Sequence, residues 1–227
     1  MAQARQYVSN RLLPEPLPEE PIAILRSWML EAAEKDAMVN PDAMTLATAD
    51  ESGRPSARIV LAKEIDPGRG AVVFFTNRES HKGRELRVNP RAALVFFWDA
   101  LHLQGRVEGP VEPVTDAESD EYWKSRWVIS RVSAWVSQQS RPLGSREEIL
   151  RKVEEASVRF GVPADGSRDA DIPRPHNWGG YRVWAERVEL WIGQPGRVHD
   201  RGLWARTLHR AGSGYRGGPW TSTRLQP

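Results

Sequence analysis

The stretch MTLATADESGRPSARIVLAKEIDPGRGAVVFFT (residues 44–76) decides the fold class of this 227-residue sequence. Its runs TLATAD, SARIVLAKEI and AVVFFT contain many β-branched, aromatic and other apolar residues, and the sequences ESGRP and DPGRG separate them. Such runs favour extended strands, and Gly and Pro between them favour tight connections. The stretch therefore predicts three consecutive strands joined by short hairpin turns.

The same pattern continues toward the C-terminus. Further strand sequences are RAALVFFW (91–98), LHLQGRVEGPVEPV (101–114) and GYRVWAERVELWIG (180–193), and GSGYRGG (212–218) predicts the tip of a hairpin. Apolar strands linked by Gly and Pro turns are typical of antiparallel sheets and barrels. We therefore expect a mainly β protein with flanking helices (α+β), built on a mostly antiparallel barrel or sheet.

Helices are expected on both sides of the strand region. Pro21 suits a first helical turn, apolar residues recur after it at the spacing of one helix face, and Pro41 would stop that helix. Thr115 and Ser145 each stand three positions before a Glu, which is the capping-box pattern of a helix start. Residues 161–177 are rich in Pro and Asp and predict a polar loop.

One domain is expected at residues 21–227, because barrels of this length commonly stay undivided. Residues 1–20 are rich in Pro and Glu and lack apolar periodicity. A segment of this composition cannot bury much apolar surface by itself. We therefore expect residues 1–20 to form a mobile N-terminal arm.

Composition argues against several classes of function. The 32 basic and 30 acidic residues leave a net charge of +2, so charge gives no reason to expect a nucleic-acid partner. No cysteine is present, which excludes disulfides, thiolate nucleophiles and Cys-ligated metals. No leader-like apolar segment stands at the start, and no run approaches the roughly 20 apolar residues that cross a bilayer. We expect a cytoplasmic protein with no membrane partner and no bound metal.

Several cofactor motifs are missing too, since no GxGxxG follows a strand and neither a P-loop nor HExxH occurs. The remaining candidates are basic and hydroxyl residues. Tyr122, Arg126 and Ser130 follow one another at intervals of four, so a single helix would place all three on one face. Their guanidinium and hydroxyl donors suit a phosphate, although a surface helix with a salt-bridged Arg has the same spacing.

Two further candidate sets lie near the first strands. Arg58 and Lys63 are an odd number of residues apart, so an ideal strand would direct them to opposite faces and different groups, unless it twists. Ser80 is expected to cap a short helix whose first turn holds His81 and Lys82, where free N–H groups and a lysine favour an anion. Solvated strand charges and water at the helix start are the alternatives.

A fourth set lies in GRVHDR (196–201), where Arg197, His199 and Arg201 alternate and would project from one face of an extended segment. Three potential cations on one face favour an anion or an electron-rich ring between them. The alternative is a strand edge neutralised by nearby acids. Trp191 upstream offers either an aromatic wall or an ordinary core residue.

Longer motifs occur in a fixed order along the chain: RIVLAK, FFTNRESHKGREL, NPRAALVFFW, a YxxxR pattern, SAWVSQQS, WGGYRV, ERVELWIG, RVHDR and the terminal RLQP. In this order and at these spacings, from about residue 22 to residue 227, they resemble the pyridoxamine 5′-phosphate oxidase family. The resemblance implies a split β-barrel that forms a homodimer, with FMN at the subunit interface. It also implies oxidation of pyridoxamine or pyridoxine 5′-phosphate to pyridoxal 5′-phosphate, with hydride passing to the flavin and O2 reduced to H2O2.

The resemblance also implies roles for individual residues. Those implied at the FMN site are Arg58, Ile59, Val60, Leu61, Lys63, Phe75, Thr76, His81, Lys82, Gln104, Gln139, Ser140, Trp191 and Arg201, with Arg58, Lys82 and Ser140 at its phosphate. Those implied for the substrate are Lys63, Tyr122, Arg126 and Ser130 at the 5′-phosphate, and Arg197 and His199 over the pyridine ring as catalytic residues. The sequence has His81, Leu103 and Trp127 where the family usually has Arg, Arg and Pro.

Other functions remain open at this point. A neighbouring branch of the family oxidises a reduced precursor in phenazine biosynthesis with the same fold and cofactor. The phosphate clamp favours a vitamin B6 substrate over a phenazine, whereas Trp123, Trp127 and Leu103 favour a larger ring. A flavin-binding split barrel without turnover and, more distantly, a nucleic-acid-binding barrel are the alternatives from other classes.

Overall fold

The computed structural model describes residues 10–163 and 165–227 of the chain. Most of its regular structure is strand. The strands are β1 (Ala43–Ala49), β2 (Pro55–Leu61), β3 (Glu64–Asp66), β4 (Ala71–Asn77), β5 (Arg91–Trp98), β6 (Leu103–Pro113), β7 (Trp178–Trp184), β8 (Arg187–Ile192), β9 (Asp200–Ala205), β10 (Leu208–Ala211), β11 (Gly214–Gly217) and β12 (Thr221–Arg224). The α-helices are α1 (Pro21–Glu34), α2 (His81–Val88), α3 (Asp116–Ser125), α4 (Val128–Val136) and α5 (Arg146–Phe160), and two 3₁₀ turns are η1 (Asp99–Leu101) and η2 (Pro195–Arg197).

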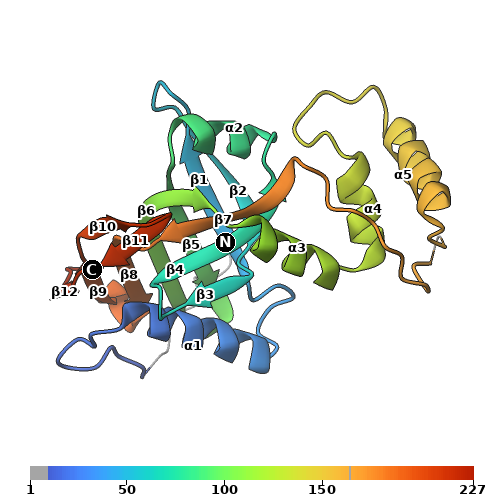
Figure 1. Cartoon of the computed structure of the whole chain (residues 1–227). Coiled ribbons are helices and arrows are strands. Elements are labelled where there is room, and N and C mark those ends of the chain that lie inside the picture. Colours follow the sequence, from blue (N-terminus) through green and yellow to red (C-terminus); the bar gives the residue numbers. More distant parts are fainter. Residues whose placement is uncertain (1–9, 164) are drawn as a thin grey trace.

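A single curled antiparallel sheet forms the centre of the molecule (Figure 1). Its strands follow the order β12-β9-β8-β6-β5-β1-β2, and the far end of β6 pairs with β7, which pairs with β4 and so reaches β3. The long strand β6 therefore belongs to both halves of a split barrel. The first predicted hairpin is confirmed, with β1 and β2 in register from Ala43↔Leu61 to Ala49↔Pro55. The run SARIVLAKEI was predicted as one strand, but it forms β2 and the separate β3, and β3 makes the second hairpin with β4.

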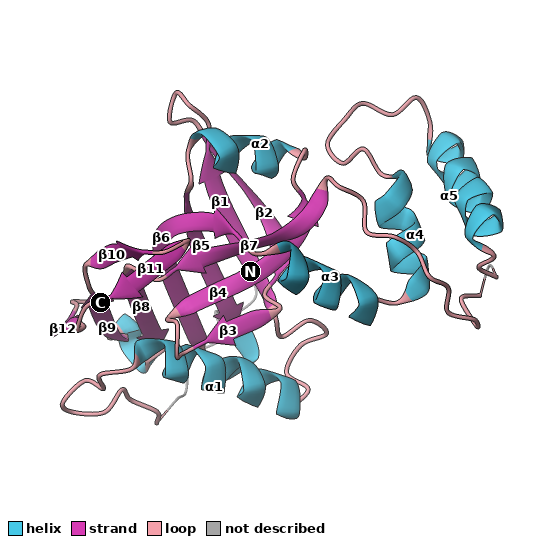
Figure 2. Cartoon of the chain, in the orientation of Figure 1, coloured by secondary structure: helices cyan, strands magenta, loops and turns pink. Residues whose placement is uncertain are grey.

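The helices lie at three places around this sheet, with α2 beside β1 (Figure 2). Helix α1 covers one face of the barrel, while α3, α4 and α5 extend from the side opposite β8, β9 and β12. Helix α1 buries Leu25 and Trp28 in the barrel core, as its apolar periodicity predicts. Gly105 on β6 allows this close packing, because a Cβ there would lie 2.2 Å from the Cδ1 atom of Leu25.

A second apolar cluster holds α3, α4 and α5 together beside the barrel. Trp123, Val132, Ile172 and Trp178 are buried in it. The Trp123 indole N–H donates to the Ile172 carbonyl at 2.7 Å, so the loop 161–177 is fastened to α3. This cluster supports the part of the chain that carries Tyr122, Arg126 and Ser130.

The helix starts were predicted correctly, and one helix end was not. Thr115 forms a complete capping box with Glu118 at the start of α3, and the Ser145 side chain accepts from the Glu148 N–H at the start of α5. Helix α1 ends at Glu34, well before Pro41, because the chain turns at Asp36, whose φ is +50°. Pro41 therefore does not stop this helix.

The segment expected to be a mobile arm makes specific contacts over its described part. Residues 1–9 lie outside the described residues, and residues 10–20 run against the barrel. Leu13 is buried, and its N–H donates to the Asp200 carboxylate at 2.6 Å. The Trp204 indole N–H donates to the Pro18 carbonyl at 2.6 Å. Residues 10–20 thus differ from the expectation, because their partners lie almost two hundred residues away and leave no local pattern.

Candidate functional site

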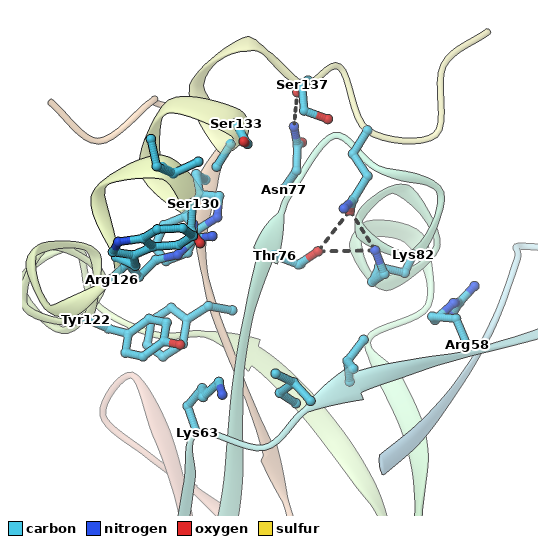
Figure 3. Close-up of a pocket in the computed structure, with 18 of the residues that line it drawn as sticks. Arg58, Lys63, Thr76, Asn77, Lys82, Tyr122, Arg126, Ser130, Ser133 and Ser137 are labelled. Atoms are coloured by element: carbon cyan, nitrogen blue, oxygen red, sulfur yellow. Dashed lines mark hydrogen bonds between the residues drawn. The ribbon is translucent and has the colours of Figure 1, made fainter. Parts of the chain in front are cut away.

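A cavity of about 780 Å³ lies between the barrel strands β2 and β4 and the helices α2, α3 and α4 (Figure 3). Most of the residues predicted for the site line it. They are Arg58, Ile59, Val60, Leu61, Lys63, Phe75, Thr76, Lys82, Tyr122, Arg126, Ser130 and Gln139. Lining residues that sequence reasoning did not assign include Asn77, Trp127, Ile129 and Trp178.

The charge of the lining is one-sided. Arg58, Lys63, Lys82 and Arg126 line the cavity, and no Asp or Glu is among the described residues that do so. Removing cations from water without a counter-charge is costly, and a bound anion offsets that cost. Figure 3 shows Arg58 and Lys82 toward one end and Lys63 and Arg126 toward the other. The cavity therefore offers two separate cationic ends.

At the first end, Ser80 caps α2 as predicted, since its hydroxyl accepts from the Gly83 N–H. This places Lys82 in the first helical turn, where it is buried. Its ammonium donates to Gln139 Oε1 at 2.8 Å, Thr76 Oγ1 at 3.2 Å and Ser80 Oγ at 3.3 Å. All three partners are neutral.

Burial lowers the pKa of Lys82 to about 8, and the nearby Arg58 charge acts in the same direction while Glu85 opposes it. The neutral oxygens around Lys82 do not cancel its positive charge, so that charge can attract an anionic ligand. The positive end of α2 adds to the same field. This end of the cavity is therefore suited to an anion.

Glu85 on α2 is a buried carboxylate behind Arg58 that sequence reasoning missed. It accepts from Ser56 Oγ at 2.7 Å and from Thr48 Oγ1 at 2.5 Å, and its Oε2 lies 3.3 Å from Arg58 Nη2. Burial raises the pKa of Glu85, but the hydrogen bonds from Thr48, Ser56 and Arg58, together with the interaction with His81, outweigh burial and keep the pKa low. No local signal marks this role of Glu85, because its hydroxyl and guanidinium partners come from β1 and β2, and only His81 lies on its own helix.

Two of the residues predicted for the FMN site, His81 and Ser140, do not line this cavity. His81 is half exposed, and its Nε2 lies 3.0 Å from Glu85 Oε1, so it faces the outer side of α2. It lines a separate hollow with Asp50 and Arg84. Ser140, exposed and with a φ of +69°, follows Gln139 but is not among the lining residues.

At the second end, the predicted single helix for Tyr122, Arg126 and Ser130 is wrong. Helix α3 ends at Ser125, Arg126 is extended with φ −75° and ψ 143°, and α4 begins at Val128. The spacing of four shows no sign of this break. All three side chains nevertheless line the same cavity, because the break at Arg126 and Trp127 lets α4 leave the end of α3 in a new direction.

Arg126 lies in this bend without a complete set of partners. Its guanidinium packs over the rings of Trp178 and Trp123, at 4.9 and 5.4 Å from their centroids. Its Nη1 is buried and has no hydrogen-bond partner among the described residues. Burial lowers the pKa of Arg126, with a smaller contribution from Arg131 and an opposing one from Tyr122. A buried, unsatisfied cation of this kind points to an anionic ligand.

Stacked aromatic rings form the wall beside Arg126. Phe75 and Tyr122 stack with their centroids 4.1 Å apart, and Phe75 and Trp178 stack at 5.5 Å. Such stacking favours a fixed ring orientation. The wall therefore sets the position of Tyr122 relative to the cavity.

Lys63 reaches the same end from just beyond β2, which ends at Leu61. Its ammonium lies 2.6 Å from Asp42 Oδ2, and both side chains are about one-quarter exposed. Asp42 is a second acid that sequence reasoning missed, since it precedes β1 and reaches Lys63 only through the fold. Asp42 forms this ion pair with Lys63 but does not itself line the cavity.

The remaining predicted residues form a second group on β6, β8, β9 and the segment that precedes β9. Gln104 pairs with Trp191, and Trp191 pairs with Arg201 on the next strand. The His199 ring lies 4.6 Å from the Trp191 ring. Burial lowers the pKa of His199, and the charges of Arg197 and Arg201 lower it further.

The expected single face for Arg197, His199 and Arg201 is wrong. Arg197 ends the 3₁₀ turn η2, with φ +64°, and Gly196 before it has φ +67°. Strand β9 begins only at Asp200. Period-two alternation therefore does not apply to this segment, although the three residues stay close enough to interact electrostatically. None of the second group lines the cavity, which lies across the barrel from β8 and β9.

Two further findings on the described residues concern metal-binding clusters and membrane-spanning helices. Within residues 10–163 and 165–227, no group of three or more His, Cys, Asp and Glu side chains is arranged to hold a metal ion. The described helices include none with the length and apolar character to cross a membrane.

Fold and site together define a split β-barrel protein with a cavity suited to anionic ligands. The chain belongs to the pyridoxamine 5′-phosphate oxidase family, a family of oxidoreductases. Residues 30–160 match the family model described as pyridoxamine 5′-phosphate oxidase. Residues 178–227 match the model described as the pyridoxine 5′-phosphate oxidase C-terminal dimerisation region. The resemblance found in the sequence motifs is thereby confirmed.

Curated relatives match over nearly the whole chain. A pyridoxine/pyridoxamine 5′-phosphate oxidase from Anaeromyxobacter dehalogenans is 47% identical over 215 residues, which cover 95% of this chain and 99% of the relative. One of the same name from Pseudomonas paraeruginosa is 44% identical over 210 residues, covering 89% of this chain and 94% of the relative.

Solved structures confirm the mainly β split-barrel fold. PhzG from Burkholderia lata 383, in complex with tetrahydrophenazine-1-carboxylic acid, superposes with a TM-score of 0.81 at 31% identity and covers 96% of this chain and 98% of its own. A pyridoxamine 5′-phosphate oxidase-related, FMN-binding protein from Nostoc punctiforme has a TM-score of 0.65 at 17% identity, covering 93% and 99%. At that identity, the second match supports the fold alone.

Proposed function

We propose that this protein binds FMN and oxidises pyridoxamine or pyridoxine 5′-phosphate to pyridoxal 5′-phosphate, with O2 as the acceptor and H2O2 as the second product. The observation that carries the proposal is the pair of cationic ends in one cavity, because both FMN and the substrate carry a phosphate. Relatives named pyridoxine/pyridoxamine 5′-phosphate oxidase at 47% and 44% identity support the choice of substrate.

The residues at the α2 end fit a flavin phosphate. Lys82 is buried among neutral oxygens, and Arg58, which is paired with Glu85, lines the same end, so an anion bound there would supply the counter-charge that Lys82 lacks. Thr76 and Gln139 add polar groups within hydrogen-bond distance of Lys82. FMN, when bound, supplies the acceptor for a hydride and the site at which O2 is reduced.

The residues at the other end fit the substrate phosphate. Arg126 offers an unsatisfied guanidinium, and Tyr122, Ser130 and Lys63 line the cavity around it. A phosphate clamp at a distance from the reacting carbon converts binding energy into alignment. The chain's task is then placement, with the aromatic wall limiting how the substrate ring can tilt.

Arg197 and His199, the expected catalytic residues, require a second copy of the chain in this proposal. In one chain they lie with Trp191 across the barrel from the cavity. A homodimer with FMN at its interface would bring the second group of one subunit to the cavity of the other. The match of residues 178–227 to a dimerisation region supports this arrangement. Arg197 would cover the substrate ring, and His199 would bind it or hold a proton beside it.

Oxidation of a reduced phenazine precursor is the second candidate function. PhzG, which superposes at a TM-score of 0.81, was solved with tetrahydrophenazine-1-carboxylic acid. In this chain, Trp127 and Ile129 extend the apolar part of the cavity lining next to Arg126. A tricyclic carboxylate could use both the apolar surface and the cation.

Anaerobic flavin reduction distinguishes these functions. Purified protein with FMN would be mixed with pyridoxine 5′-phosphate or pyridoxamine 5′-phosphate without oxygen, and the flavin band at roughly 450 nm followed. The proposal predicts rapid bleaching by at least one of the two phosphates and far slower bleaching by unphosphorylated pyridoxine. Bleaching only by a tetrahydrophenazine carboxylate would favour the second function, and a stable spectrum with all of them would contradict both.

A further inference from the structure

Asn77 joins the two segments that supply the flavin-phosphate end of the cavity. It is the last residue of β4 and is buried. Its Nδ2 donates to the Ser137 carbonyl at 3.2 Å, just after α4 (Figure 3). Its Oδ1 accepts from the Glu79 N–H at 2.8 Å, just before α2. One side-chain amide thus contacts the start of α2 and the segment that follows α4.

The segment after α4 has few other attachments to the barrel. Residues 138–140 are exposed. Among the described residues, three hydrogen bonds join residues 137–144 to the barrel and α2: Asn77 to Ser137, Thr76 to Gln139 at 3.2 Å, and Lys82 to Gln139 at 2.8 Å. Two of these depend on the Gln139 side chain. Of these three, only the Asn77 bond joins the backbone of the segment to the barrel, while the Ser137 N–H bonds to the Ser133 carbonyl at the end of α4.

Energetic magnitudes show why this bond matters. Fixing the backbone of one residue costs about 1–2 kcal/mol of conformational entropy, and a typical hydrogen bond returns only about 1 kcal/mol net. An exposed segment with three such bonds is therefore only marginally fixed. Loss of its backbone bond would leave Gln139 free to move away from Lys82.

We propose that Asn77 is a positioning residue for the flavin phosphate. It holds Lys82 and Gln139 at one place by fastening the start of α2 and the segment after α4 to the end of β4. The proposal rests on the FMN site proposed above. This role of Asn77 is indirect, because Asn77 acts through Lys82 and Gln139. We do not propose a contact between Asn77 and a phosphate oxygen.

Asn77→Ser separates the two contacts. The serine hydroxyl still accepts from the Glu79 N–H, as Ser does in comparable turns, but it is too short to reach the Ser137 carbonyl. Asn77→Thr, with the same hydroxyl and a β-branch that suits a strand, is the second variant if the first folds poorly. Asn177→Ser is the matched control, because Asn177 contacts Arg78 through its backbone carbonyl.

The readout is the dissociation constant of FMN compared with that of riboflavin, which lacks the phosphate. We expect Asn77→Ser to weaken FMN about tenfold, the scale of one hydrogen bond to a charged group, and to leave riboflavin unchanged. In a Gln139→Ala background the same substitution should add little, since its effect passes through Gln139. Asn177→Ser should leave both constants at their wild-type values.

The outcomes separate this proposal from the proposed function. Equal weakening of FMN and riboflavin would show a general structural effect and overturn the positioning role, as would wild-type FMN affinity in both Asn77 variants. Fully additive losses in the Gln139→Ala background would also overturn it. A wild-type protein that binds FMN no more tightly than riboflavin would instead contradict the flavin-phosphate site itself.

Discussion

Lys82 combines burial with neutral hydrogen-bond partners, and its ionisation therefore responds to ligands. Its pKa is lowered from the usual value for lysine, 10.5, to about 8. A bound phosphate dianion stabilises the protonated form and raises that pKa again. Above about pH 8, binding of FMN must therefore be accompanied by uptake of a proton.

We predict that FMN affinity falls as the pH rises through about 8, by up to about tenfold per pH unit. The flavin phosphate itself is already fully ionised there, because its second pKa is about 6. Titration of the flavin-free protein at pH 7 to 9.5 would measure the effect. Lys82→Arg, which keeps its charge throughout this range, should flatten the profile. Constant wild-type affinity from pH 7 to 9.5 would contradict the role of Lys82.

Arg126 is the corresponding cationic residue at the opposite end of the cavity. Its unsatisfied Nη1 and its contact with two indole rings could not be predicted from sequence, since Trp178 comes from a distant strand. The sequence could predict that Arg126 is a candidate cation and that Tyr122 and Ser130 accompany it. Spacing thus identified three residues that line one cavity, although the helix geometry assumed for them was incorrect.

At the scale of elements, the bend between α3 and α4 places the substrate end of the cavity. Trp127 has φ −53° and ψ 136°, and Arg126 before it is extended. Proline requires a φ near −65° and an extended preceding residue, so this backbone already suits proline. The bend does not depend on the tryptophan side chain, which is 62% exposed.

We predict that Trp127→Pro changes the free energy of unfolding by no more than about 1 kcal/mol. Val132→Pro, the same substitution in the middle of α4, should cost about 3 kcal/mol or more, because it removes a helical hydrogen bond in the buried second cluster. Urea unfolding of both variants would measure the difference. Equal destabilisation by the two substitutions would show that Trp127 itself holds the bend.

The elements show which sequence signals are reliable. The hairpins around residues 44–76, the cap at Ser80 and the capping box at Thr115 were predicted because each depends on residues adjacent in sequence. The positive φ values at Gly196 and Arg197 and the extended Arg126 were not, because the sequence spacing was interpreted as an extended segment in one case and a continuous helix in the other. The side-chain spacings of helices and strands do not apply to a segment that is neither helix nor strand.

At the scale of the whole molecule, the predicted site residues separate into two groups on opposite sides of one barrel. The cavity group comes from β2, β4 and α2 to α4, and the second group from β6, β8, β9 and the segment that precedes β9. Sequence motifs cannot show this separation, because they give no distances. Glu85, Asp42 and Asn77 were missed for the same reason, since their partners are brought to them only by the fold.

We infer that one complete site needs the cavity of one subunit and the second group of its partner. Arg126→Met removes the substrate cation from the cavity, and Arg197→Met removes a residue of the second group. Each variant alone should be almost inactive. Co-expression with two different tags would yield mixed dimers, each carrying one chain of either variant.

The activity of these purified mixed dimers is the measurement that tests the claim most directly. In a mixed dimer, the intact cavity of the Arg197→Met chain faces the intact second group of the Arg126→Met chain, so one of the two sites is complete. We predict about half of the wild-type activity per dimer. Mixed dimers as inactive as their parents would contradict the shared site and place Arg197 with the cavity of its own chain.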